Sequence, residues 1–370
     1  MIFKKIFAFI KSEIVLVISG ICAAVSMIFV PPNADYLGYI DLRVISLLFC
    51  LMLVVAGFQQ CGLFKILAKK LLSGEKSFRI ISLILTLLPF FTSMLITNDV
   101  ALITFVPFTI IVLKLINMEK YSIKIIVLQT IAANLGSMAT PIGNPQNLFL
   151  YAKYQISTWD FFTTMLPLTL ISLFCLALAA FCTKNQKCKV RFETDETVRI
   201  PKKILLFAAL FLLCILSVFH LLNYWILLAI VVISLAIFDR KLFSKADYGL
   251  LLTFIFFFIF AGNIGKITVI QDFLSEIMAK NSQLTSILTS QVISNVPTAV
   301  LLSGFTEDWR GLLVGVNIGG LGTPIASLAS LISLKIYTKS DGAKPCRYLA
   351  FFTAANIIGV GILCLFDFMA

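Results

Sequence analysis

Two short stretches of this 370-residue chain place polar and helix-breaking residues inside apolar sequence. The first, Asn134–Asn144, reads NLGSMATPIGN, and the second, Asn317–Ser327, reads NIGGLGTPIAS. Aligned without a gap, their first nine residues agree at five positions. Unwound backbone at membrane depth exposes N–H and C=O groups that can bind an ion or a small solute. The candidate binding residues here are Asn134, Gly136, Thr140, Asn147, Asn317, Gly319 and Thr323.

A second kind of polar stretch precedes each of these segments. TSMLITNDVALITFVPF begins at Thr92, and TSQVISNVPTAVLL begins at Thr289. Each carries two hydroxyl residues four positions apart, which share one face of a helix, followed directly by an asparagine. We interpret both stretches as helical hairpins whose tips bind a solute, and we expect the two arms of the first hairpin to be too short to cross the membrane. The candidate tip residues are Ser93, Thr97, Asn98, Ser290, Ser294 and Asn295.

Asp99 follows the first tip asparagine and is the acidic residue that falls deep inside a hydrophobic stretch. A carboxylate at this depth is expensive, by roughly 2.5–3.5 kcal/mol, and usually marks a functional site. Asp99 either binds a coupling cation or carries a proton. A structural alternative is that it caps the helix that follows it.

The composition requires a membrane setting for these stretches. The chain is 60% hydrophobic and 13% charged, with a mean hydropathy of +1.01, which a soluble domain does not reach. Its nine cysteines show no spacing typical of metal or redox sites and are interpreted as small apolar side chains. No metal-ligand cluster or nucleophile–base pair appears, so no enzyme is predicted. The sequence therefore predicts an all-α polytopic membrane protein.

The basic residues predict an orientation. We expect membrane crossings at 12–31, 43–60, 122–152, 160–182, 204–220, 224–238, 248–262, 311–334 and 348–368, with hairpins at 80–116 and 282–305. An amphipathic segment at 264–281 is expected to lie at the outer face, just before the second hairpin. With a cytoplasmic N-terminus, 25 of the 30 Lys and Arg residues lie on the inner side of a cell membrane. The net charge of +12 therefore reflects orientation and not a nucleic-acid partner.

The same topology predicts an internal duplication. One hairpin opens inward and the other outward, so the two copies of hairpin plus broken helix have opposite orientations. We expect a single transmembrane domain with repeat 1 at about 38–182, a cytoplasmic connector at 183–203 and repeat 2 at about 204–368. Inverted repeats with broken helices are typical of secondary transporters.

The motifs TNDVALITFVPF, TPIGNPQN, SNVPTAVLL and GGLGTPIAS resemble those of the ion transporter superfamily, over about residues 38–368. This superfamily groups divalent anion/sodium symporters, citrate transporters, arsenite permeases and a class of sodium/proton antiporters. The resemblance implies an elevator-type transporter and a homodimer. It also implies one Na⁺ site at Ser93, Thr97, Asn98 and Gly143, and another at Ser290, Ser294, Asn295 and Ala326.

The sequence departs from the symporter pattern at both tips. Asp99 and Val296 stand where symporters carry threonines that contact a carboxylate. An ionised Asp99 would repel a dianion, so the resemblance points to the arsenite permease and antiporter branches. We expect a secondary transporter for a small anion or oxyacid, coupled to H⁺ or Na⁺, and no further cofactor. The alternative is a Na⁺/H⁺ antiporter without an anion substrate.

Overall fold

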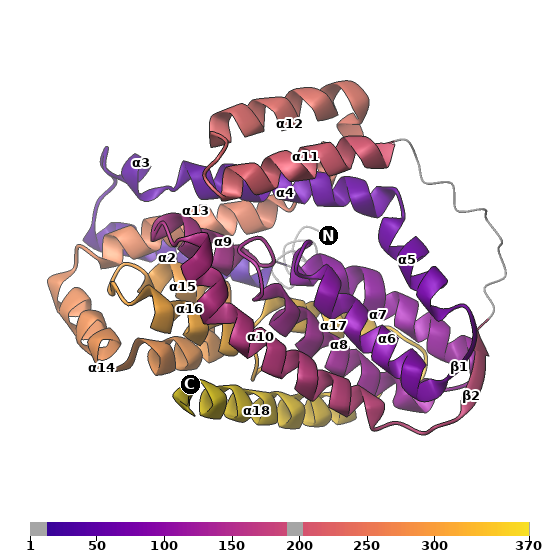
Figure 1. Ribbon diagram of the computed structural model, residues 1–370. Coiled ribbons are helices and arrows are strands. Elements are labelled where there is room, and N and C mark those ends of the chain that lie inside the picture. Colours follow the sequence, from indigo (N-terminus) through magenta and orange to yellow (C-terminus); the bar gives the residue numbers. More distant parts are fainter. Residues whose placement is uncertain (1–12, 191–202, 370) are drawn as a thin grey trace, which may run out of the picture.

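The computed structural model describes residues 13–190 and 203–369, and in this part of the chain it consists mostly of helices (Figure 1). The mostly helical fold predicted from the sequence is therefore confirmed. The helices used below are α2 (Ile14–Phe29), α4 (Leu42–Gln60), α5 (Leu63–Leu72), α6 (Phe78–Thr92), α7 (Asn98–Leu115), α8 (Ser122–Ser137), α9 (Pro145–Lys153), α10 (Thr158–Phe181), α11 (Lys203–Val218), α12 (Tyr224–Phe238), α13 (Tyr248–Ile264), α14 (Thr268–Ile293), α15 (Asn295–Leu302), α16 (Trp309–Ile318), α17 (Leu328–Thr338) and α18 (Pro345–Met369).

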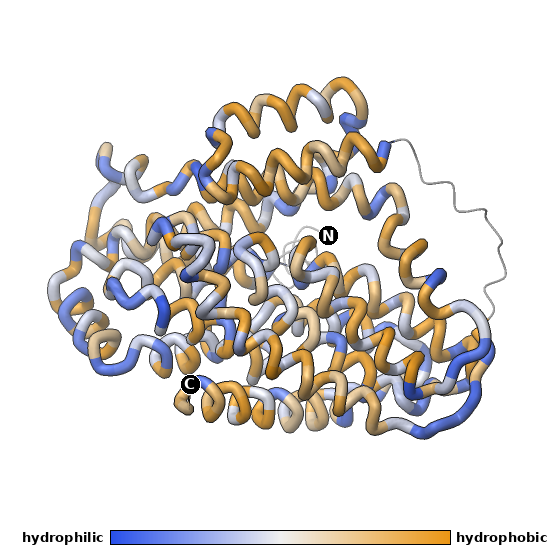
Figure 2. The backbone as a smooth tube through the Cα atoms, in the orientation of Figure 1, coloured by the Kyte–Doolittle hydropathy of each residue, from blue (hydrophilic) through white to orange (hydrophobic). Residues whose placement is uncertain are grey.

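Apolar helices occupy the predicted membrane segments. Among the described residues, four helices are long and apolar enough to cross a membrane: α4, α7, α10 and α18. The pair α13 and α14, bent by 102°, raises this number to five if it counts as one span. Figure 2 shows hydrophilic segments gathered at the left and right ends of the molecule, with mostly hydrophobic helices between them. This pattern fits a protein that spans an apolar layer.

A small sheet departs from the purely helical prediction. Strand β1 (Gly74–Ser77) pairs antiparallel with β2 (Lys187–Val190), which lies in the segment predicted to be a connecting loop. Side chains alternate along β2, so that Cys188 and Val190 are buried while the two lysines are exposed. One face of the strand therefore packs against the protein, while the other face is exposed. The predicted cytoplasmic N-terminus at 1–12 and residues 191–202 of the connector lie outside the described residues.

Both glycine-containing stretches interrupt helices, as the sequence predicted. The chain leaves helical geometry between α8 and α9, and again between α16 and α17. Asn144 begins α9 because its side-chain oxygen accepts a hydrogen bond from the Asn147 amide, with Pro145 in the first helical position. In the second break Gly322 has a φ of +107°, which favours glycine.

The two predicted hairpins differ in their arms. The first consists of α6 and α7. With 18 residues, α7 is long and apolar enough to cross a membrane, so the expectation that both arms are too short to cross is wrong for this helix. In the second hairpin α15 has only eight residues. Helix α14 is bent at Asn281, whose φ of −165° is not helical, at the predicted junction between an amphipathic segment and the hairpin.

The helices of the two halves pack in a reciprocal pattern. Helix α6 packs against α8, and α14 packs against α16, so each hairpin contacts the broken helix that follows it in the sequence. The second arms also reach the opposite half: α7 packs against α17 as well as α8, and α15 packs against α9 as well as α16. Each hairpin therefore contacts both broken helices, and the breaks are brought together at the centre of the fold.

Gln129 closes a gap in the backbone of the first hairpin. Pro89 lies inside α6 and has no N–H group, so the carbonyl of Leu85 lacks its helical partner. Gln129 Nε2 donates to this carbonyl at 2.7 Å and to Thr109 Oγ1 on α7, also at 2.7 Å. One fully buried side chain of α8 thus ties both arms of the hairpin together.

We predict that Gln129→Leu lowers the free energy of unfolding by about 1–3 kcal/mol, because it leaves the Leu85 carbonyl buried without a donor. Thermal unfolding of the purified protein in detergent measures this loss. The control is Gln271→Leu, at an exposed position of α14, which should unfold like the wild type. Equal stability of Gln129→Leu and the control would contradict the role of this side chain.

Candidate functional site

A group of hydrogen-bonded polar residues joins the first hairpin tip to both helix breaks. We call it the tip cluster; it comprises Asn98, Asn134, Ser327, Ser330 and the carbonyl of Gly320. Asn134 Oδ1 accepts from Asn98 Nδ2 at 2.9 Å and from Ser327 Oγ at 3.2 Å. Asn134 Nδ2 lies 3.4 Å from both Gly320 O and Ser330 Oγ. All four side chains are buried, so these bonds replace water at the break.

A second group, the break cluster, joins the two broken helices directly. It comprises Asn144, Asn147, Asn317 and Ser137. Asn144 Nδ2 donates to Asn317 Oδ1 at 3.1 Å, and Asn317 Nδ2 donates to Asn147 Oδ1 at 2.7 Å. Asn144 Nδ2 also donates to Ser137 Oγ at 3.2 Å. The amides of residues about 170 positions apart thus form one buried network.

Matched serine–glycine contacts hold each hairpin close to its broken helix. A Cβ atom added to Gly136 would lie 2.7 Å from Ser93 Oγ, and one added to Gly319 would lie 2.8 Å from Ser290 Oγ. These distances are too short for carbon and oxygen, so only glycine fits at either position. Ser93 and Ser290 occupy equivalent positions in the two hairpin sequences, and Gly136 and Gly319 are equivalent in the two breaks.

Two threonine hydrogen bonds repeat the same correspondence. Thr140 Oγ1 donates to the carbonyl of Met94 at 2.5 Å, and Thr323 Oγ1 donates to the carbonyl of Gln291 at 3.1 Å. Met94 and Gln291 each follow the serine that contacts the glycine. The second break is held further by Gln291, whose Nε2 donates to the carbonyls of Gly319 and Leu321. The repeated sequence motif therefore forms repeated contacts.

Helix N-termini meet at these clusters. Asn98 is the first residue of α7, and Ser327 is the N-cap of α17; both donate to Asn134. At the start of α15, the Asn295 amide donates to the carbonyl of Ala326 at 2.9 Å. A helix N-terminus carries partial positive charge and free N–H groups. The convergence of these ends favours a solute with oxygen acceptors or negative charge.

The two predicted cation-binding sets differ in how far they are assembled. In the second set, the Ala326 carbonyl accepts from Asn295 N and from Ser294 Oγ, so three members are in contact. Because both hydrogen bonds use that carbonyl, a cation there must displace one of them. In the first set, no hydrogen bond among the described residues joins Ser93, Thr97 or Asn98 to Gly143.

Asp99 lies in the first turn of α7 and is half-buried. Its backbone amide bonds to Asn98 Oδ1 at 3.1 Å, whereas its carboxylate forms no hydrogen bond with another described residue. The capping alternative raised by the sequence is thus not what the structure shows, because Thr97 is the N-cap residue and no side chain caps α7. The Asp99 carboxylate is left for a proton, a cation or water.

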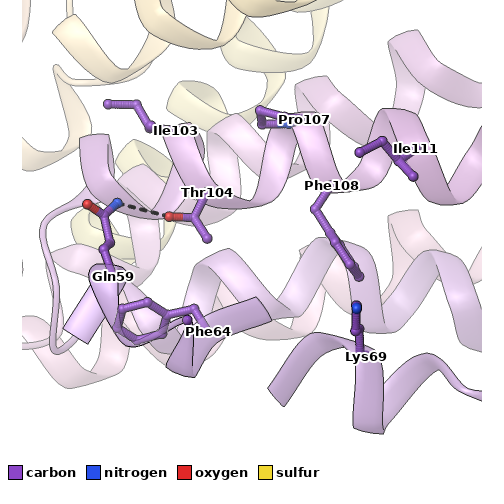
Figure 3. Close-up of a pocket in the computed structure, with 9 residues that line it drawn as sticks. Gln59, Phe64, Lys69, Ile103, Thr104, Pro107, Phe108 and Ile111 are labelled. Carbon is purple, nitrogen blue, oxygen red and sulfur yellow. Dashed lines mark hydrogen bonds between the residues drawn. The ribbon is translucent and has the colours of Figure 1, made fainter. Parts of the chain in front are cut away.

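A cavity of about 540 Å³ lies between the end of α4, helix α5 and helix α7 (Figure 3). Ile103, Pro107 and Ile111 of α7 line it, whereas Asp99 is not among the lining residues. Gln59 Nε2 on α4 donates to Thr104 Oγ1 on α7 at 3.1 Å, and this bond joins the two helices beside the cavity.

Several residues that form these hydrogen bonds were absent from the predicted site: Asn144, Ser137, Gly320, Gln291, Ser327 and Ser330. Asn144 and Ser327 could have been recognised as helix caps, since each precedes the resumed helix. The others carry no local signal. Their roles depend on contacts between segments far apart in the chain.

A helical fold whose helices break twice at membrane depth, with the breaks joined by buried amides, is typical of a membrane transporter. The citrate transporter family model matches residues 2–306. This chain therefore belongs to the citrate transporter family, whose members are transporters and not enzymes.

Similar proteins agree with this class. An uncharacterized transporter of Methanocaldococcus jannaschii, MJ0456, is 35% identical over 298 residues, covering 80% of this chain and 81% of its own. The inner membrane protein YbiR of Escherichia coli is 31% identical over 303 residues and 80% of each chain. The silicon efflux transporter LSI3 of Oryza sativa is 32% identical over 150 residues, which cover 40% of this chain and 30% of LSI3.

We predict that Gly136→Ala and Gly319→Ala each lower the thermal stability of the protein, because the added methyl group meets a serine hydroxyl and, at Gly136, the Phe90 carbonyl. Overpacking of this kind costs about 1–3 kcal/mol. The control is Gly361→Ala in α18, where a Cβ meets nothing within 4 Å and alanine favours the helix. If the break variants were as stable as this control, the close approach would be refuted.

Proposed function

We propose that this chain is a secondary active transporter that moves a small oxyacid or small organic anion, coupled to H⁺ or Na⁺. The observation that carries this proposal is the tip cluster, in which Asn134 links the N-termini of α7 and α17 at a helix break. Such a junction presents amide and hydroxyl groups to a solute within the membrane.

We further propose that the two halves are inverted repeats and work as an elevator. The reciprocal packing of α7 on α17 and of α15 on α9 supports this view, since a twofold relation would exchange these pairs. The matched Ser93–Gly136 and Ser290–Gly319 contacts support it as well. In this proposal the hairpins and broken helices move together, while helices α4, α11, α12 and α13 stay fixed. A homodimer in the cell membrane, with a cytoplasmic N-terminus, completes the proposal.

The chemistry of the clusters favours a small oxyacid over a multiply charged anion. The tip and break clusters consist of amides, hydroxyls and a carbonyl, and contain no Lys or Arg. Such groups bind hydroxyl and oxo groups without requiring a full charge. An ionised Asp99 would repel an anion by about 4 kcal/mol at 4 Å for an effective dielectric constant of 20. The name of the rice relative, a silicon efflux transporter, fits an oxyacid substrate.

In this proposal Asp99 carries the coupling ion. It lies next to Asn98, and its carboxylate has no hydrogen-bond partner among the described residues. Binding of H⁺ or Na⁺ would remove the repulsion between Asp99 and an anionic substrate, which couples the two binding events. The remaining oxygen groups of the two predicted cation sets would hold Na⁺.

The same carboxylate supports a second candidate, a Na⁺/H⁺ antiporter in which Asp99 exchanges the two cations. Purified protein in proteoliposomes distinguishes the candidates. A Na⁺ gradient alone should drive H⁺ flux for the antiporter. For the oxyacid transporter, arsenite, silicic acid or a carboxylate must be present for flux, and the substrate should raise the thermal stability of the folded protein.

We predict that Asp99→Asn abolishes or uncouples transport without preventing folding, because the amide keeps the shape and cannot titrate. The measurement is substrate flux in proteoliposomes as a function of pH and Na⁺. Asp272→Asn, at an exposed site of α14, serves as the control. Wild-type flux with an unchanged pH profile in Asp99→Asn would exclude the coupling role.

We predict that Asn98→Ala and Asn295→Ala each reduce flux about tenfold or more, since each removes a buried amide side chain that would contact the solute at a hairpin tip, a loss of about 1–3 kcal/mol. Flux is normalised to the amount of folded protein in the vesicles. Exposed Asn33→Ala should transport like the wild type. Full activity of either tip variant would show that the two tips do not form one site.

A further inference from the structure

A groove of about 430 Å³ lies between α8, α10 and α18, and no residue of the two hydrogen-bonded clusters lines it. Its walls are apolar side chains, and its hollow comes from small residues that include Ala179 on α10 and Ala355 and Gly359 on α18. Because these positions lack large side chains, neighbouring helices leave a channel between them. Lys124 of α8 lies among the lining residues.

The helices that form the groove are little covered by protein. In the most apolar part of each helix, only 33% of α10 and 17% of α18 is buried inside the molecule. Large apolar side chains such as Phe174 and Ile358 are more than half exposed on these helices. In a membrane these faces contact lipid, so the groove is open to acyl chains.

The length of the groove matches one leaflet. Along α8 it extends from Lys124 to Leu135, which at about 1.5 Å per residue is about 16 Å. The hydrocarbon core of a bilayer is about 30 Å thick, so one leaflet contributes about 15 Å. An acyl chain anchored at one end would therefore reach the other end of the groove near the middle of the membrane.

One end of the groove carries positive charge. Lys124 Nζ donates one hydrogen bond, to the carbonyl of Cys182 at the end of α10, and two ammonium hydrogens remain for a ligand. Arg79 Nε donates to the adjacent Thr183 carbonyl at 2.9 Å. Arg347 is exposed and precedes the lining residue Phe351 by one helical turn. This end of the groove thus favours a headgroup with a net negative charge over a zwitterionic or neutral one.

We propose that the groove of α8, α10 and α18 binds one anionic phospholipid, with an acyl chain along Ala179 and Ala355 and the phosphate at Lys124. The lipid is separate from the transported solute, because no residue of the tip or break cluster lines the groove. It stabilises the packing of α18 against α8 and α10.

Native mass spectrometry of the full chain, incubated with dioleoyl phosphatidylglycerol or with dioleoyl phosphatidylcholine, tests this proposal. We expect one phosphatidylglycerol to remain bound per chain, in preference to phosphatidylcholine. Lys124→Gln should weaken this binding about fivefold, the equivalent of about 1 kcal/mol for one basic residue. Lys245→Gln, on a segment that does not line the groove, is the charge control.

A pair of substitutions on α10 tests the position of the acyl chain. Ala179→Phe fills the groove and should abolish retention of phosphatidylglycerol, whereas Ala177→Phe, two residues away and outside the lining, should retain it. Transport and thermal unfolding of both variants show whether they fold. Equal retention by the two variants, or no preference for phosphatidylglycerol, would overturn the proposal. If Ala179→Phe instead converted a dimer into monomers, the groove would be a contact between subunits and not a lipid site.

Discussion

The constraint on which the structure depends is that backbone and amide groups at membrane depth must find partners within the protein. Two helices stop in the middle of the fold, and lipid cannot satisfy the groups that they leave free. The break cluster meets this requirement: Asn144, Asn147 and Asn317 bond to one another, and Asn147 also donates to the carbonyls of Met138 and Thr140 in the unwound segment. Each break is therefore stabilised by hydrogen bonds to the other.

This mutual dependence explains several features that look unrelated in the sequence. Glycines at 136 and 319 let each hairpin approach its break closely enough for the tip to lie beside the unwound segment. The contacts of the second arms with the opposite half, α7 on α17 and α15 on α9, place helix N-termini from both halves around the same polar groups. A solute bound there contacts both halves at once. Movement of the site through the membrane would then carry all of these elements together, as the proposed elevator requires.

Local chemistry made part of this structure predictable. Glycine and proline act on their own segment, so the breaks after α8 and α16 and the tip before α15 follow from the sequence alone. The pairing of Asn144 with Asn317 does not, because it depends on how segments 173 residues apart meet in space. Gln129 shows the same limit: Pro89 signals an unpaired carbonyl, but nothing local identifies the donor. The strand at Lys187–Val190 was missed because a four-residue alternation is too short to distinguish from a loop.

The most direct test of the account is a double-mutant cycle on the bond between the two breaks. The thermal stabilities of Asn144→Ala, Asn317→Ala and the double variant are measured in the same detergent and compared with the wild type. The account predicts a coupling free energy of about 0.5–3 kcal/mol, as for residues in direct contact. Effects that add to within about 0.3–0.5 kcal/mol would show that the two asparagines act independently, and would contradict the central claim that each break stabilises the other.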